Sequence, residues 1–314
     1  MKNLLLAASL LALSTTLTQA ETIGISLATF DDNYQTVMRN KIQTYADTLD
    51  GVDVQFEDAQ NDLAKQLDQI NNFIANGVDG IMVTLVDTSA AQSLTDAAAA
   101  AGVPLVFMNL QPINLETLPD TEAYVGANEI ESGTLGAFEA CKLLRAQGKT
   151  NGAKGYILIG GLSHAAAIQR TKDVHDVIGM DMCNFMTIID EQTGEWSRDK
   201  GQSLMTNWLS TGEKPDFVFG NNDEMAIGAI QAMKAAGIDM KDVVVFGVDA
   251  TEDALSAMQA GDMDVTVFQN GGGIGTTALD TALKLAKGEK VPRLTYVPFE
   301  LVTPANMADY MGKN

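Results

Sequence analysis

The chain alternates between short apolar runs rich in β-branched residues and longer stretches whose apolar positions recur at helical spacing. The apolar runs predict ten strands: Ile23–Ala28, Val52–Phe56, Gly80–Leu85, Pro104–Met108, Ala123–Val125, Gly155–Ile159, Met186–Ile189, Phe217–Gly220, Val243–Val248 and Val265–Phe268. The amphipathic stretches predict helices, for example over Asp62–Asn76, Ser89–Ala101, Glu129–Gln147, Ser197–Leu209 and Glu224–Ala236. Nearly continuous apolar strands that alternate with helices are typical of parallel sheets covered on both faces. We therefore expect an α/β fold with two doubly wound parallel sheets in two domains.

The first 20 residues precede this pattern and have a different character. A single lysine, Lys2, is followed by an apolar core from Leu4 to Leu13 and by small residues at Thr18 and Ala20. This order is typical of a cleavable secretory signal, and its apolar core is too short to span a bilayer. We expect cleavage after Ala20 and a location in the periplasm.

Charge and cysteine content narrow the class of protein. The 314 residues carry a formal net charge of −21, which argues against nucleic acid and anionic membranes as partners because phosphate contacts need clustered Lys and Arg. Two cysteines, Cys141 and Cys183, would form one disulfide in an oxidising compartment, and the alternative is a pair of buried thiols.

Ligands of open α/β sheets bind at the carboxyl ends of the strands, so the residues just past each strand are the candidates for a site. Nine of them are polar or aromatic: Asp32, Tyr34, Asn109, His164, Arg170, Trp196, Asn222, Asp249 and Gln269. Acids, amides and arginine suit hydroxyl groups, which both donate and accept hydrogen bonds. The aromatic rings suit the apolar faces of a sugar ring. This set predicts a polyol site that needs no cofactor.

Several residues have a structural alternative. Asp32 could cap the helix that it precedes, and Arg170 could form a surface ion pair. We expect Asp223 to be a cap or otherwise structural, Trp208 to pack in the core, and His175 to lie on the surface.

Other chemistries lack their motifs. The glycines at 271–273 and 275 match neither the dinucleotide-binding nor the P-loop spacing. Two histidines without a C-x-x-C pair make no metal site, and Ser163 beside His164 lacks the G-x-S-x-G turn of a hydrolase. We therefore expect a binding protein rather than an enzyme, with no metal.

Eight segments together resemble a known family: IGISLATFDDNY, EDAQNDLAKQLDQINNFIANGVDGI, LVD, PLVFMNLQP, YVGANEIESG, NNDEMAIGAIQAMKAAG, VFGVDATEDAL and MTNWLS. In order and spacing they are similar to the periplasmic monosaccharide-binding proteins of ABC transporters, the ribose and galactose group. The resemblance implies two Rossmann-like lobes joined by a three-segment hinge. The first lobe would comprise residues 21–126 plus 270–298 and the second 127–269 plus 299–314, with crossovers near Gly126, Asn270 and Pro298.

The resemblance also assigns roles to the nine site residues. Tyr34 and Trp196 would sandwich the ligand ring, and the other seven would hold its hydroxyls. Galactose- and glucose-binding members have an aspartate where this chain has Ala166, and the segment Ala146–Lys154 contains no acid of their calcium loop. Segments such as FDDNY and EQTGEWSR look closer to the inositol- and rhizopine-binding branch.

The expected function is a periplasmic receptor that captures a neutral monosaccharide or cyclic polyol, with a myo-inositol-like ligand first. Hinge closure would present the loaded, monomeric receptor to a membrane permease of an ABC transporter. The alternative is a galactose- or glucose-type receptor that could also serve chemotaxis, and a sugar-active enzyme is a remote third possibility. Substituting Asp249 or Arg170 by Ala is expected to abolish binding with little change in the melting temperature of the ligand-free protein.

Overall fold

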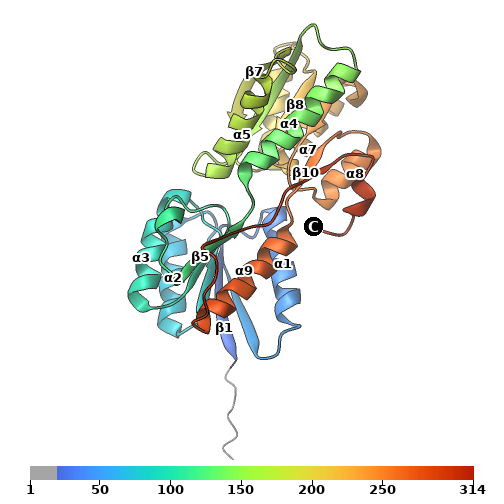
Figure 1. Ribbon diagram of the computed structural model, residues 1–314. Helices are drawn as coiled ribbons and strands as arrows, with labels where there is room; N and C mark the ends of the chain where they lie inside the picture. Colours follow the sequence, from blue (N-terminus) through green and yellow to red (C-terminus); the bar gives the residue numbers. More distant parts are fainter. Residues whose placement is uncertain (1–19) are drawn as a thin grey trace, which may run out of the picture.

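The computed structural model describes residues 20–314, which form two lobes stacked end to end (Figure 1). All ten expected strands are present: β1 (Glu21–Leu27), β2 (Val52–Asp58), β3 (Gly80–Val83), β4 (Leu105–Asn109), β5 (Glu122–Gly126), β6 (Ala153–Ile159), β7 (Met186–Thr193), β8 (Phe217–Gly220), β9 (Val244–Phe246) and β10 (Thr266–Phe268). Two further strands follow, β11 (Leu294–Tyr296) and β12 (Glu300–Val302). The predicted signal segment lies outside the described residues except for Ala20.

The first lobe is built on a six-stranded parallel sheet in the order β11-β5-β4-β3-β1-β2. Four helices cover it: α1 (Asn33–Ala46), α2 (Leu63–Asn76), α3 (Ala91–Ala101) and α9 (Gly271–Ala286). Met38 of α1 and Ile274 of α9 pack on one face of the sheet. Phe73 of α2 and Leu94 of α3 pack on the other. Helices on both faces explain why the strands are apolar at consecutive positions.

The second lobe contains the parallel sheet β7-β6-β8-β9. Five helices cover it: α4 (Glu129–Ala146), α5 (Ala165–Ile178), α6 (Arg198–Leu209), α7 (Asp223–Ala235) and α8 (Glu252–Ala260). Strand β10 lies beside β9 through parallel bridges such as Phe246 to Val265, and β12 pairs with β10 antiparallel. β12 is not one of the ten predicted strands, and it pairs antiparallel because the chain returns from the first lobe in the opposite direction.

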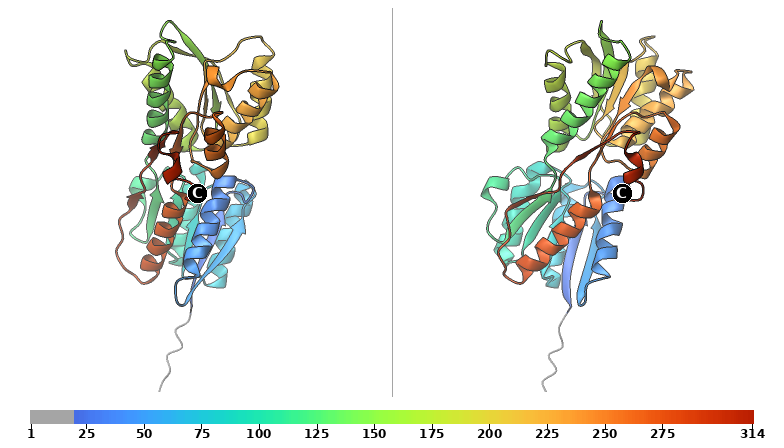
Figure 2. Two further views of the ribbon diagram at one scale, coloured as in Figure 1. Left: turned by 90° about the vertical axis from the view of Figure 1, so that its right-hand side faces the viewer. Right: turned by 45° about the vertical axis from the view of Figure 1, so that its right-hand side comes forward.

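The chain crosses between the lobes in three places (Figure 2). The crossings join β5 to α4, β10 to α9, and β11 to β12. Asn314 lies beside the second crossing, where its Nδ2 donates to the carbonyl oxygen of Gln269 (2.8 Å) and its Oδ1 accepts from the amide of Gly271 (3.1 Å). The side chain of Asn314 therefore bonds both to the residue that follows β10 and to the first residue of α9.

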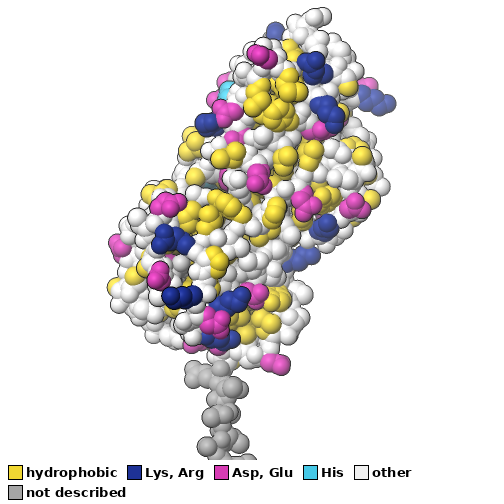
Figure 3. Space-filling model, in the orientation of Figure 1, with side chains coloured by type: hydrophobic (Ala, Val, Ile, Leu, Met, Phe, Trp, Pro, Cys, Tyr) yellow, Lys and Arg dark blue, Asp and Glu magenta, His cyan; other side chains and the backbone are white. Residues whose placement is uncertain are grey.

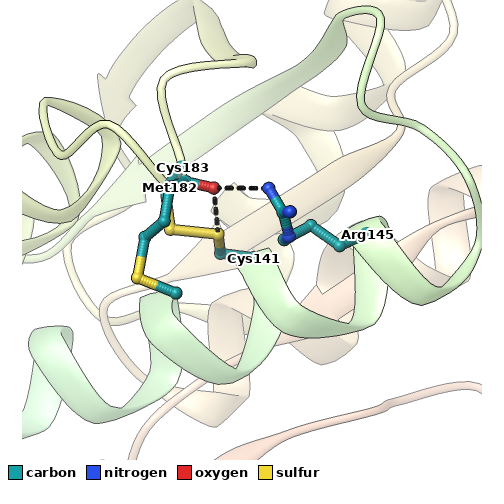
Figure 4. The surroundings of a disulfide bond; sticks show 4 residues. All are labelled: Cys141, Arg145, Met182 and Cys183. Carbon is teal, nitrogen blue, oxygen red and sulfur yellow. Dashed lines mark hydrogen bonds between the residues drawn. A yellow bond between two sulfur atoms is a disulfide. The ribbon is translucent and has the colours of Figure 1, made fainter.

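Cys141 and Cys183 are joined by a disulfide, which confirms the predicted pair and excludes two buried thiols (Figure 4). The bond links α4 to the turn that precedes β7, and both residues are fully buried. Arg145, one turn further along α4, donates to the carbonyl oxygen of Met182 (3.0 Å). The covalent bond and this hydrogen bond hold the start of β7 against α4.

Figure 3 shows acidic and basic side chains interspersed over one face of both lobes, with hydrophobic atoms between them. Of the helices in the described part of the chain, none is long and apolar enough to cross a membrane.

Candidate functional site

A polar cavity lies between the lobes, at the carboxyl ends of the strands of both sheets. Its empty space, counted together with the open mouth, is about 430 Å³. All nine residues expected at the site line it, together with three others, Gln35, Leu110 and Ala166. The structure therefore brings the whole predicted set together, from positions 32 to 269 of the chain.

Two of the predicted residues are held in place at the N-termini of helices. Asp32 caps α1 by accepting from the amide of Gln35 (2.7 Å), and Asn222 caps α7 by accepting from the amide of Met225 (3.0 Å). Both side chains also line the cavity. Asp32 therefore caps α1, as the structural alternative predicted, and it also lines the cavity. One carboxylate oxygen accepts the hydrogen bond from the helix, and the other is available to a ligand.

Arg170 lies at the centre of a buried network. Its guanidinium pairs with Glu129 (Nε to Oε2, 2.7 Å) and donates to the carbonyl oxygen of Asn221 (2.8 Å) and to Gln269 Oε1 (3.1 Å). Gln269 Nε2 in turn donates to Asn109 Oδ1 (3.0 Å). Arg170 is only 4% exposed, so the expected alternative of a surface ion pair is wrong: the pair is buried.

The carboxylate of Asp249 has no hydrogen-bond partner among the described residues, although Asp249 is only 4% exposed. Burial, and next the nearby carboxylate of Asp223, hold the pKa of Asp249 well above its usual range. Burial also raises the pKa of Asp32 to about 6. The charge of Arg170 offsets part of this effect at Asp249, and hydrogen-bond donors on a ligand would stabilise both acids further.

Two more polar groups face the same shortage of partners. The hydroxyl of Tyr34 and Oε1 of Gln35 are both buried, and neither has a hydrogen bond within the described part of the chain. A buried polar group without a partner costs roughly 1–3 kcal/mol. Several neighbouring groups on the cavity wall therefore gain from a ligand that carries several hydroxyls.

Trp196 enters the cavity from a strained turn between β7 and α6. Its φ is +65°, and Asn109 and Asp249 also have positive φ, at +67° and +124°. Such backbone geometry is costly for residues other than glycine and clusters at functional sites. Gly160 makes room for the indole, because a Cβ at that position would lie 2.2 Å from Trp196 Cζ2.

The side chain of His164 lines the cavity and does not cap the helix α5 that follows it. Its Nδ1 is 2.9 Å from the indole nitrogen of Trp196, and its Nε2 is 2.9 Å from the carbonyl oxygen of Val86. Burial lowers the pKa of His164, which favours the neutral ring. Both ring nitrogens therefore have protein partners.

The residues assigned to structural roles have them. Asp223 accepts from Thr266 Oγ1 (2.7 Å) and from the amide of Thr251 (3.0 Å) beneath the cavity. Trp208 is buried and stacks on Tyr156, with ring centroids 4.4 Å apart. His175 is half exposed beside Glu191. Residues 20–314 hold no cluster of three or more His, Cys, Asp or Glu that could bind a metal.

The strand-end rule missed the residues that support the cavity wall. Glu129 lies in the first turn of α4, and Asn221 immediately precedes the predicted Asn222. Gln35 lies one residue beyond Tyr34 and could have been found by extending the rule past the helix cap. No sequence signal marks Val86, because only its backbone carbonyl takes part.

Comparisons with known proteins agree with this geometry. Residues 23–290 match the family described as "Periplasmic binding protein domain". Over 314 residues, covering 100% of both chains, the chain is 54% identical to a putative rhizopine-binding protein of Rhizobium meliloti.

Two solved structures are similar over nearly the whole chain. One is an ABC transporter solute-binding protein from Bacillus halodurans with bound myo-inositol, 36% identical, with a TM-score of 0.86 and coverage of 96% of this chain and 100% of that one. The other is a Caulobacter myo-inositol binding protein bound to myo-inositol, 27% identical, with a TM-score of 0.83 and coverage of 92% and 95%. The predicted fold class and family resemblance are thereby confirmed.

Proposed function

This chain belongs to the periplasmic binding protein domain family, and on that premise we propose that it captures a myo-inositol-like cyclic polyol between its lobes and delivers it to the permease of an ABC transporter. Its relatives are sugar- and polyol-binding receptors of ABC transporters rather than enzymes, in agreement with the sequence-based expectation. We propose the identity of the ligand, delivery to a permease, and the place of the nine residues in the ligand site.

The cavity wall carries the proposal. The buried hydroxyl of Tyr34 and the carboxylate of Asp249 have no hydrogen-bond partner among residues 20–314, so a ligand rich in hydroxyls would supply what the protein lacks. The family's anomeric-hydroxyl aspartate is replaced by Ala166, which is buried against Leu110 of the first lobe. A cyclitol has no anomeric hydroxyl and loses nothing at this position. The myo-inositol bound by two similar structures supports the same choice.

Closure of the lobes is the proposed mechanism. The lobes would comprise residues 21–126 plus 270–298 and 127–269 plus 299–314, with the hinge at the three crossings. On both sides of the cavity the lobes already touch, through Asn33 Nδ2 to Glu224 Oε1 (3.1 Å) and Thr88 Oγ1 to the carbonyl oxygen of Ser163 (2.9 Å). This closed arrangement is the form that a ligand would stabilise.

Location and assembly follow from the same proposal. We expect the segment 1–20 to be removed after Ala20 and the mature protein to act in the periplasm as a monomer. Mass spectrometry of the protein isolated from the periplasm would give the new N-terminus, and a mass that begins elsewhere would overturn the cleavage site.

The test is a calorimetric titration of protein that has been unfolded, dialysed and refolded to remove any bound ligand. The probes are myo-inositol, D-ribose, D-galactose and D-glucose. We expect micromolar or tighter binding of myo-inositol and at least tenfold weaker binding of the three aldoses. Preferred binding of galactose or glucose would establish the alternative receptor class, and no heat with any polyol would overturn the proposal. Asp50→Asn, an exposed acid far from the cavity, is the control for Asp249→Asn.

A further inference from the structure

The imidazole of His164 is held at both nitrogens by the protein. An indole N–H can only donate, so Trp196 Nε1 donates to Nδ1 at 2.9 Å, and Nδ1 carries no proton. The proton of the neutral ring is then on Nε2, which donates to the carbonyl oxygen of Val86 at 2.9 Å. The ring has no third polar atom, so no nitrogen of His164 is available to a ligand hydroxyl in this arrangement.

The two partners of His164 come from different lobes. Trp196 belongs to the second lobe, as His164 does, whereas Val86 follows β3 in the first lobe. The amide of Val86 donates to Oε1 of Gln66 (3.0 Å), and Gln66 is fully buried on α2. The acceptor that meets His164 is therefore fixed by the core of the first lobe rather than by a free loop.

A second contact between the lobes lies next to the first. The hydroxyl of Thr88 donates to the carbonyl oxygen of Ser163 at 2.9 Å, and its amide lies 3.4 Å from that oxygen. Ser163 directly precedes His164, so two successive residues of the second lobe bond to the segment 86–88 of the first. Separation of the lobes would break both contacts together.

We propose that His164 is a positioning residue that couples closure of the lobes to the orientation of Trp196, and that it does not read a ligand hydroxyl. This inference rests on the proposed function. In the closed form the bond to Val86 fixes the ring and its tautomer, and the fixed Nδ1 holds the indole of Trp196 against the cavity. In the open form the Nε2 proton loses its acceptor, so the ring can rotate or change tautomer and the indole loses its anchor.

The proposal predicts a kinetic signature. The bond between His164 and Val86, here called the latch, forms only on closure, so it slows release of the ligand without speeding its entry. Loss of the latch should raise the dissociation rate constant about tenfold and leave the association rate constant within about twofold. Loss of a direct contact would instead weaken only those ligands that carry the hydroxyl concerned.

The experiment is surface plasmon resonance with myo-inositol and D-galactose, which needs no tryptophan reporter, on wild type, His164→Ala, Trp196→Phe and the double variant. Because His164 and Trp196 act through one hydrogen bond, the double variant should release ligand no more than about twofold faster than the faster single variant. The ratio of the two affinities should be the same in His164→Ala as in wild type. His164→Gln, whose amide can still donate towards Val86, should fall between wild type and His164→Ala.

The controls separate the possible failures. His175→Ala removes an exposed histidine and should behave as wild type. If His164→Ala fails to fold, Trp196→Phe still tests the coupling, because it keeps an aromatic ring at position 196 but removes the indole N–H that donates to His164. A changed affinity ratio in His164→Ala, or fully multiplicative effects of the two substitutions, would overturn the latch while leaving the receptor function intact. Absence of binding in wild type would overturn the proposed function, and the latch with it.

Discussion

Asp249 shows how a single residue can be unfavourable for the free protein and useful to the complex. Its carboxylate is buried near the carboxylates of Asp223 and Asp32, at a backbone φ of +124°. Among the described residues it has no hydrogen-bond donor, so part of the cost of burying it is recovered only when a ligand binds. Stability of the free protein and affinity for ligand are therefore opposed at this position.

Asp249→Asn should separate these two quantities. Asparagine tolerates positive φ and removes a carboxyl group that burial disfavours in its charged form, so the free energy of unfolding of the ligand-free protein should rise by about 1–2 kcal/mol. Affinity for myo-inositol should fall by about a hundredfold, because a hydrogen bond to a charged acceptor contributes about 1.5–3 kcal/mol. Urea unfolding and calorimetry measure the two effects, with Asp50→Asn as the control. A loss of ligand-free stability would contradict this account.

Arg170 requires the opposite expectation for stability, and here the structure changes the prediction made from the sequence. Arg170→Ala leaves the carboxylate of Glu129 buried without its partner, which should cost about 3–5 kcal/mol of the free energy of unfolding. Adding Glu129→Gln to the same protein should restore part of this loss. Thermal unfolding of ligand-free protein tests the pair, and an unchanged melting temperature in Arg170→Ala would show that the ion pair contributes little.

At the scale of elements, the hydrophobic pattern was sufficient for the fold where strands are buried on both faces. Consecutive apolar residues such as those at 105–108, which directly follow Pro104, favour an interior strand. Strands β11 and β12 escaped prediction because each has three residues, mostly only half buried or exposed. The antiparallel direction of β12 depends on its return from the other lobe, which no local pattern records.

The same contrast holds for the site. The cavity residues could be predicted because strand ends are recognisable, and a doubly wound sheet places them together. The partnership of Arg170 with Glu129 could not, because the two residues are 41 positions apart and meet only through the packing of α4 on α5. Nor could the role of His164, since its partner is a backbone carbonyl of the other lobe.

Packing of β5 against α3 creates a pH dependence that is separate from the cavity. Glu122 of β5 is only 1% exposed, and its Oε2 accepts from Thr95 of α3 at 2.8 Å. Burial raises the pKa of Glu122 from 4.5 to about 7. The folded protein therefore binds this proton more tightly than the unfolded chain does, and the free energy of unfolding should fall as the pH rises from about 4.5 to about 7.

Glu122→Gln should remove that dependence. Its amide keeps an oxygen for Thr95, whose hydroxyl also accepts from Nδ2 of Asn114. At pH 8 the variant should be more stable than wild type by up to about 3 kcal/mol, and at pH 4 the two should be equal. Urea unfolding at several pH values measures this difference. Glu116→Gln, an exposed substitution, should follow wild type, and a constant gap between Glu122→Gln and wild type would contradict the assignment.

At the scale of the whole molecule, single hydrogen bonds join the lobes across the cavity, together with the small apolar side chain of Ala166. Single hydrogen bonds such as Asn33 to Glu224 contribute about 1 kcal/mol each, which is too little to hold two lobes together without a ligand. The ligand-free protein should therefore populate an open form, and saturation with myo-inositol should lower its radius of gyration in small-angle X-ray scattering. Asp249→Asn at the same ligand concentration should stay expanded. Equal radii for wild type with and without ligand would show that closure does not depend on the ligand.

The three crossings also have a consequence for biosynthesis. The core of the first lobe includes Ile274, Ala278 and Leu279 of α9, and its sheet ends with β11 at Tyr296. A ribosome that has synthesised β1 to β5 has therefore made only part of that lobe, with the apolar face that α9 covers still open to water. Neither lobe is a continuous segment, so no single cut yields an autonomous piece. The first lobe can therefore close its core only when translation is almost complete, because α9 and β11 come near the end of the chain.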